Sequence, residues 1–223
     1  KKISNSLREE QKKYSINIGG GDTVYSRKLS FTITSIGFPK KIIYRNKAKI
    51  GDDIYVTGNL GDSYIGLKVL KKSIKMNKRL GNYFKKKYYY TDLNIKLIRK
   101  LLSLANTSID ISDGLFTDLD KLINKQKLSY KLYLKDVPIS QNLKRLIDLR
   151  LIKKINCISK GDDYQILFTA KPSKSNIINK TSKTLGIKIS KIGKICSSSY
   201  ASEIIDEKKA KIIPKNKGYF HSF

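Results

Sequence analysis

The sequence predicts an α/β fold, an α+β sandwich in which helices pack against a sheet. Two periodicities alternate along its 223 residues: apolar residues at every second position are typical of strands, and apolar residues three or four apart are typical of helices. At residues 108–123 one pattern follows the other. Ile109 and Ile111 alternate with polar residues as in a strand, and helical spacing begins after Gly114. With 39% hydrophobic residues, the chain can build a sizeable core.

The remaining elements follow from the same two patterns. An amphipathic helix is predicted at residues 2–14, then strands at 16–18 and at 29–38, where the alternation stops at Pro39. Residues 40–53 are a basic connector between two domains. Beyond it, the predicted elements are a strand at 54–58, helices at 65–70 and 92–105, the strand and helix of 108–123, a strand at 131–138 with a helix in the next ten residues, a strand–loop–strand at 157–170, a helix closed by Gly186, and a strand at 188–195.

The net charge of +29, from 47 basic and 18 acidic residues, has two interpretations. A nucleic-acid partner is the functional one, and the sequence YFKKKYYY at 83–90, with tyrosines that could stack on bases, keeps it open. The other is drift in an AT-rich genome, because lysine far outnumbers arginine and is spread along the whole chain. A nucleic-acid site usually concentrates its charge and uses arginine. We prefer drift.

Composition also excludes several classes of protein. No apolar run is long enough to span a membrane, and residues 1–15 lack the apolar core of a signal peptide. Cys157 and Cys196 are isolated, without metal-site spacing, which predicts reduced thiols in a cytoplasmic protein. His221 is the one histidine, so the chain has almost no residues from which to build a Ser-His-Asp triad or a histidine–metal site.

The segment SIDISDGLFTDLDKL, residues 108–122, gathers four carboxylates, Asp110, Asp113, Asp118 and Asp120. Asp110 and Ser112 should project from the same strand face, and Asp113 should follow at the start of the helix, where backbone N–H groups point outward. This combination suits a hydrated Mg²⁺ ion that carries a phosphate. In the alternative interpretation, Asp113 is an N-cap and Asp110 a solvated strand residue.

Two further motifs combine glycine with carboxylates. In GGGDT, residues 19–23, the glycines would let the backbone approach phosphates and Asp22 would hold their counter-cation. In GDDYQILF, Asp162 and Asp163 precede an apolar strand and could bind a cationic ligand. The alternative for GGGDT is a tight turn between two strands, and the alternative for Asp162 and Asp163 is a solvated turn, which is the more frequent case for adjacent carboxylates.

Taken in order, GGGDT, GDDIYVTGNLGDS, NTSIDISDGL, GDDYQILF and the C-terminal KGYFHSF resemble the thiamine-monophosphate kinase family. This family belongs to a wider group that includes aminoimidazole ribonucleotide synthetase. The resemblance runs from about residue 15 to the end. It implies ATP-dependent phosphorylation of thiamine monophosphate to thiamine diphosphate with Mg²⁺. The alternatives are a basic nucleic-acid-binding module on the same fold and another ATP-dependent enzyme of the group.

The resemblance also implies roles for individual residues. No side chain is expected to act as a covalent or acid–base catalyst, because positioning and metal ions carry such a transfer. Asp162 stands where the family usually has a glutamate, and Asn216 where some members have an aromatic residue. The implied Mg²⁺ ligands are Asp22, Asp110 and Asp113; the ATP-binding residues are Gly21, Asp22, Arg45 and Ser112; and the substrate-binding residues are Asp162 and Asn216.

The resemblance implies two domains. Residues 1–43 would be the C-terminal part of the ATP-binding domain, and residues 44–223 a complete C-terminal α/β domain of the aminoimidazole ribonucleotide synthetase type. The earlier part of the ATP-binding domain, which carries further magnesium ligands in the family, has no counterpart before Lys1. We therefore expect a homodimer for the full-length protein and no turnover from this chain alone. Thiamine diphosphate formed by the 223-residue chain would contradict the second expectation.

Overall fold

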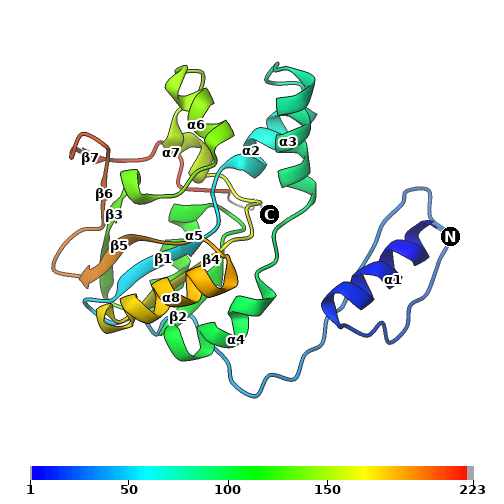
Figure 1. Cartoon of the computed structure of the whole chain (residues 1–223), viewed down its shortest axis with the longest axis horizontal. Coiled ribbons are helices and arrows are strands. Elements are labelled where there is room, and N and C mark those ends of the chain that lie inside the picture. Colours follow the sequence, from blue (N-terminus) through cyan, green and yellow to red (C-terminus); the bar gives the residue numbers. More distant parts are fainter. Residues whose placement is uncertain (1, 220–223) are drawn as a thin grey trace. The chain divides into compact units, whose positions relative to one another are not determined.

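The computed structural model describes residues 2–219 and divides the chain into two compact units (Figure 1). The first ends at Pro39 and the second begins at Lys40, and each is described by itself. The predicted domain boundary between residues 43 and 44 stays a prediction. His221, with the rest of the C-terminal HSF, lies outside the described residues.

The first unit contains one helix, α1 (Lys2–Tyr14), as predicted. The strands predicted at 16–18 and 29–38 are wrong, because these residues form neither helix nor strand. Leu29, Phe31 and Ile33 do alternate with polar residues, but their exposed fractions are 82%, 62% and 80%. A strand needs a neighbour for its N–H and C=O groups and a core for its apolar face. The described part of this unit provides neither.

The second unit is built on one seven-stranded sheet with the order β2-β4-β1-β5-β3-β6-β7. The β3–β6 pair is parallel and the other pairs are antiparallel. Together with its helices, this sheet confirms the predicted α/β class. The strands are β1 (Asp53–Thr57), β2 (Thr107–Asp110), β3 (Leu128–Tyr133), β4 (Ile166–Ala170), β5 (Ile189–Ser197), β6 (Glu203–Ile205) and β7 (Lys211–Ile212).

Helices cover both faces of this sheet (Figure 1). Ile54 and Val56 of β1 pack into the core cluster that contains the apolar side of α5 (Leu115–Ile123). Tyr55, which must point the other way, packs with residues of α4 (Ile95–Leu104) and α8 (Ser175–Leu185). The two-residue alternation of one strand therefore contributes to two separate hydrophobic layers.

A third cluster joins four helices beside the sheet. Its buried members include Ile65, Phe84, Leu143 and Cys157. The first strand predicted within 157–170 is wrong, because its first residues lie in a short helix. The basic segment at 83–90 belongs, up to Tyr89, to a helix capped by Asn77. The helices of this cluster are α2 (Asp62–Leu70), α3 (Lys78–Tyr89), α6 (Gln141–Asp148) and α7 (Lys154–Ile158).

The other predicted elements of the second unit are present with shifted ends. The strand predicted at 131–138 gives way to a 3₁₀ turn, η1 (Leu134–Asp136), and a second such turn, η2 (Pro172–Lys174), precedes α8. Gly186 ends α8 with a left-handed φ of 62°, as the sequence predicts. Within residues 2–219, no helix has both the length and the apolar character to cross a membrane.

Candidate functional site

The acidic segment forms a tight loop between β2 and α5, as predicted. Gly114, the residue before α5, has a φ of +123°, which favours glycine. A Cβ atom at Gly114 would lie 2.3 Å from the carbonyl oxygen of Ser159. The loop therefore packs closely against a second segment of the chain and needs glycine at this position.

Asp118 holds this loop from inside. Its carboxylate accepts hydrogen bonds from the backbone N–H groups of Ser112, Asp113 and Gly114, at 3.0, 2.9 and 3.1 Å. The side chain is almost completely buried, and burial raises its pKa although the N–H donors and Lys121 oppose the shift. Asp118 is thus a structural residue that fixes the backbone of the acidic loop.

Asp113 projects from this loop and pairs with Lys121. The lysine contacts two carboxylates, those of Asp113 and Asp118. The Lys121 ammonium donates to Oδ2 of Asp113 and lies 3.4 Å from Oδ1 of Asp118. Its hydrogen bond to Asp113 raises the pKa of Lys121. Asp113 is consequently fixed both through its own backbone and through a cation.

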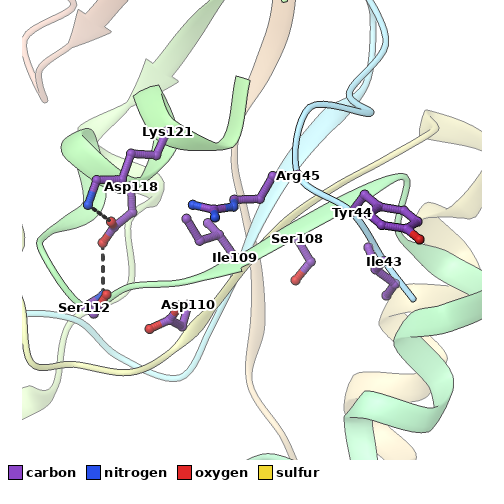
Figure 2. Close-up of a pocket in the computed structure, with 9 residues that line it drawn as sticks. All are labelled: Ile43, Tyr44, Arg45, Ser108, Ile109, Asp110, Ser112, Asp118 and Lys121. Atoms are coloured by element: carbon purple, nitrogen blue, oxygen red, sulfur yellow. Dashed lines mark hydrogen bonds and ion pairs between the residues drawn. The ribbon is translucent and has the colours of Figure 1, made fainter. Parts of the chain in front are cut away.

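A cavity of about 460 Å³ opens beside this loop, and three predicted residues, Asp110, Ser112 and Arg45, are among those that line it. Figure 2 shows the Arg45 guanidinium extending toward the side of the cavity where Asp118 and Lys121 lie. The full lining is Ile43, Tyr44, Arg45, Ser108, Ile109, Asp110, Ser112, Asp118 and Lys121.

The backbone on either side of Arg45 is hydrogen-bonded to β2 and α5. The carbonyl oxygen of Tyr44 accepts a 2.7 Å hydrogen bond from the Thr107 hydroxyl, and the Asn46 N–H donates to the carbonyl oxygen of Leu122 at 2.8 Å. Arg45 therefore reaches the cavity from a segment anchored to both β2 and α5.

Asp162 belongs to a loop that lies against the acidic loop. Its N–H donates to the carbonyl oxygen of Ser112 at 3.0 Å, and the Tyr164 N–H donates to that of Ile111 at 2.8 Å. Burial and then the nearby charge of Asp113 raise the pKa of Asp162. The predicted substrate carboxylate and a predicted metal ligand are thus close enough to interact.

The C-terminal segment closes the other side of the acidic loop. The Tyr219 N–H donates to the carbonyl oxygen of Asp113 at 2.8 Å, and the Thr117 N–H donates to that of Lys217 at 3.2 Å. Asn216 is exposed, and its side-chain oxygen accepts a 2.9 Å hydrogen bond from the Gly218 N–H. This turn places Asn216 next to the segment that contacts the loop.

Two of the predicted site residues lie in the first unit. Gly21 and Asp22 are exposed, and the Asp22 carboxylate accepts a 2.7 Å hydrogen bond from the Thr23 N–H. Their part in the site stays a prediction. Asp120, the last of the four carboxylates, instead accepts hydrogen bonds from Tyr130 and Lys217, both at 3.0 Å, which is a structural arrangement.

The donor atoms present suit Mg²⁺ better than a softer metal. Within residues 2–219, no three histidine, cysteine, aspartate or glutamate side chains group closely enough to enclose a metal by themselves. Mg²⁺ does not need such a cage, because it keeps several water ligands and binds through one or two carboxylates plus substrate phosphates. Asp110 and Asp113 are the predicted residues of the second unit that could supply such carboxylates.

Two further residues, Asp118 and Lys121, contribute to this region without a role that the sequence analysis predicts. Asp118 could have been recognised as an acidic residue in the first turn of a helix, where it meets outward-pointing N–H groups. Lys121 had a weaker signal: it lies three residues after Asp118, a spacing that brings side chains together on a helix. Both act on the backbone or the charge of the predicted ligands.

Comparison with known proteins identifies the relatives of this chain, although no protein-family model matches it. It is 37% identical to the thiamine-monophosphate kinase of Buchnera aphidicola subsp. Schizaphis graminum, an alignment that covers 99% of this chain and 68% of the relative. The Haemophilus influenzae enzyme of the same name is 34% identical over 86% of this chain and 59% of its own length. The structure of AaThiL in complex with AMPPCP and TMP superimposes with a TM-score of 0.64 and 24% identity, covering 80% of this chain and 54% of that one.

The mixed sheet with helices on both faces and the acidic loop place the chain in a class of α/β proteins that share the fold of solved thiamine-monophosphate kinases. Within this class, the chain belongs to the thiamine-monophosphate kinase family. The sequence-based assignment to that family is confirmed. These relatives favour a kinase over the basic nucleic-acid-binding module.

Proposed function

We propose that this protein contributes to the Mg²⁺-dependent transfer of the γ-phosphoryl group of ATP to thiamine monophosphate, which yields thiamine diphosphate. The observation that carries the proposal is the convergence of Asp110, Ser112 and Arg45 on one cavity, next to the loop that presents Asp113. The relatives named thiamine-monophosphate kinase support the same reaction. The chain spans about two thirds of the first of them and just over half of the solved structures.

In this proposal, the reaction is accelerated mainly by electrostatic stabilisation and by positioning of the reactants. Phosphoryl transfer passes through a state with negative charge spread over the transferred oxygens, so fixed cations and in-line placement lower its energy. Mg²⁺ would supply the largest positive charge, held through Asp110 and Asp113. Arg45 would bind nucleotide phosphate with its planar fork of donors, and Ser112 would donate a hydrogen bond to the nucleotide.

Asp162 would face the acceptor. Thiamine carries a cationic thiazolium ring, so a carboxylate placed beside the loop that holds the nucleotide can orient the acceptor by charge. Asn216 lies next to the C-terminal segment that contacts Asp113. It would complete the acceptor side with an amide where other members of the family use an aromatic ring.

The acceptor half of the proposal is tested by titrating thiamine monophosphate into the 223-residue chain with saturating AMPPCP and Mg²⁺. Asp162 has a left-handed φ of 67°, which asparagine tolerates, so Asp162→Asn removes the charge and keeps the backbone. We expect it to weaken acceptor binding about tenfold. Asp148→Asn, exposed at the end of α6, is the matched control. Equal affinities for Asp162→Asn and the wild type would contradict the assigned role.

We further propose a cytoplasmic location, where Cys157 and Cys196 would stay as the free thiols that the structure contains. We also propose a homodimer, the assembly that the family resemblance implies, which sedimentation analysis would test.

A further inference from the structure

Lys121 is a cation of the candidate site that the proposed function leaves without a role. It lines the same cavity as Arg45 and Ser112. Its ammonium contacts Asp113 and Asp118, and Figure 2 shows the contact with Asp118. The side chain is 39% exposed, so it is accessible from the cavity.

The two carboxylates that Lys121 contacts differ in how far they are engaged elsewhere. Asp118 accepts three backbone N–H groups and is 1% exposed, so it is committed to the loop. Asp113 is 17% exposed, and within residues 2–219 the Lys121 ammonium is the one cation that forms an ion pair with it. Asp113 is therefore the carboxylate that a ligand could take over, while Asp118 would still hold the lysine nearby.

We propose that Lys121 is a phosphate-binding residue: it neutralises Asp113 in the ligand-free protein and moves onto a ligand phosphate when Mg²⁺ takes its place. The inference rests on the proposed function. It assigns Lys121 a position beside Arg45, so that the cavity presents two cations to a phosphate.

The exchange follows from the charges and distances. Mg²⁺ binds carboxylate oxygen at about 2.0–2.1 Å, and an ammonium in contact with the same oxygen would repel it. Lysine has a flexible four-carbon stem with three donors, so a small rotation carries the ammonium to another anion. Phosphate held by the metal would lie within reach, because the ion that displaces the lysine also carries the phosphate.

A purely structural ion pair would predict a different response. Half-exposed pairs contribute little to stability, and losing one would lower metal and phosphate affinity together or leave both unchanged. An exchange of partners predicts opposite changes: without Lys121, Asp113 is free for the metal, while phosphate loses a donor.

The experiment measures binding by isothermal titration calorimetry in the 223-residue chain and three variants. Lys121→Met removes the ammonium, Lys121→Arg keeps a charge, and Lys127→Met removes an equal charge from an exposed position four residues past α5. The probes are MgCl₂ alone, AMPPCP with saturating MgCl₂, and thiamine monophosphate with saturating MgCl₂. Thermal unfolding confirms that each variant is folded.

We expect Lys121→Met to bind MgCl₂ about tenfold more tightly and a phosphate ligand about tenfold more weakly, with Lys121→Arg in between and Lys127→Met like the wild type. Weakened AMPPCP binding assigns Lys121 to the nucleotide phosphates, and weakened thiamine monophosphate binding assigns it to the acceptor phosphate. If the wild type binds these ligands and Lys121→Met changes neither metal nor phosphate affinity, the inference is overturned alone. If the wild type binds neither AMPPCP nor thiamine monophosphate, the proposed function fails with it.

Discussion

The backbone N–H of Tyr219 donates a 2.8 Å hydrogen bond to the carbonyl oxygen of Asp113, which joins the last described residue to the acidic loop. From the other side, the Asp162 N–H donates to the carbonyl oxygen of Ser112. The segments that contain Asp162 and Tyr219 lie about 50 and 100 residues further along the chain, and both contact the acidic loop at Ser112 and Asp113. The position of the predicted metal ligand depends on all three segments.

The close approach of the 159–162 segment predicts a specific intolerance at Gly161. A Cβ atom there would lie 1.7 Å from the carbonyl oxygen of Ser112, so one of the two loops must move. We expect Gly161→Ala to lower the free energy of unfolding in urea by about 2 kcal/mol. Gly81→Ala, inside α3, is the control. Its Cβ would meet only ordinary contacts, at 3.6 Å from Val69 and 3.7 Å from Met76, and alanine should stabilise the helix relative to glycine. Equal stability of the two variants would contradict the packing described.

Removing the carboxylate of Asp118 should destabilise the acidic loop strongly. Asp118→Ala leaves three backbone N–H groups without their acceptor and Lys121 with one fewer anion. The expected loss is about 3 kcal/mol in urea unfolding. Asp148→Ala, on the exposed end of α6, should change stability by no more than about 0.5 kcal/mol. A loss at Asp118 as small as at Asp148 would show that the three hydrogen bonds to Asp118 are not needed for stability.

Asp163 predicts that stability falls as pH rises toward 8. Its carboxyl is buried against the start of α2, where it accepts a 2.8 Å hydrogen bond from the Gly61 N–H, and burial raises its pKa to about 8. The unfolded pKa is about 3.9. Between these pH values the native state keeps a proton that the unfolded state has lost. Each pH unit of increase therefore lowers the free energy of unfolding by up to about 1.4 kcal/mol. Burial raises the pKa of Asp62 as well, which acts in the same direction.

The measurement is urea unfolding of the wild type and Asp163→Asn at pH 5, 6, 7 and 8. Asparagine cannot ionise but keeps an oxygen that can accept from Gly61. The stability of the variant relative to the wild type should therefore increase from pH 5 to pH 8. Parallel pH profiles would show that Asp163 is charged in the native state, contrary to the prediction.

Much of the second unit is predictable from local pattern. The alternation around Ile109, the helical spacing after Gly114 and the glycine at 186 all correspond to observed elements. These signals are reliable because each element has a core to pack against, so the period of the sequence matches the period of burial.

The first unit shows where the same signals fail. The alternation at residues 29–38 is as regular as that of β2, yet it forms no strand in the described structure. A strand is stabilised by its neighbours, and the pattern of one segment contains no information about whether a neighbour is present.

The site is predictable in its residue types and less so in its support. The spacing of Asp110, Ser112 and Asp113 identifies the loop, and all three lie at or beside one cavity. The contacts of Asp118 with the loop and of Tyr219 with Asp113 depend on how distant segments pack. The contacts of Lys121 are unpredictable for a similar reason, since a lysine on a helix surface is usually only a solvated charge.

The most direct test of the account is Mg²⁺-dependent binding of AMPPCP to the wild-type chain and to Asp113→Asn, followed by calorimetry. If Asp113 is a magnesium ligand, the wild type should bind AMPPCP more tightly with Mg²⁺ than with chelator, and the variant should lose about tenfold in affinity only when Mg²⁺ is present. If Asp113→Asn binds AMPPCP with unchanged affinity in the presence of Mg²⁺, the acidic loop is not the metal site and the account is wrong.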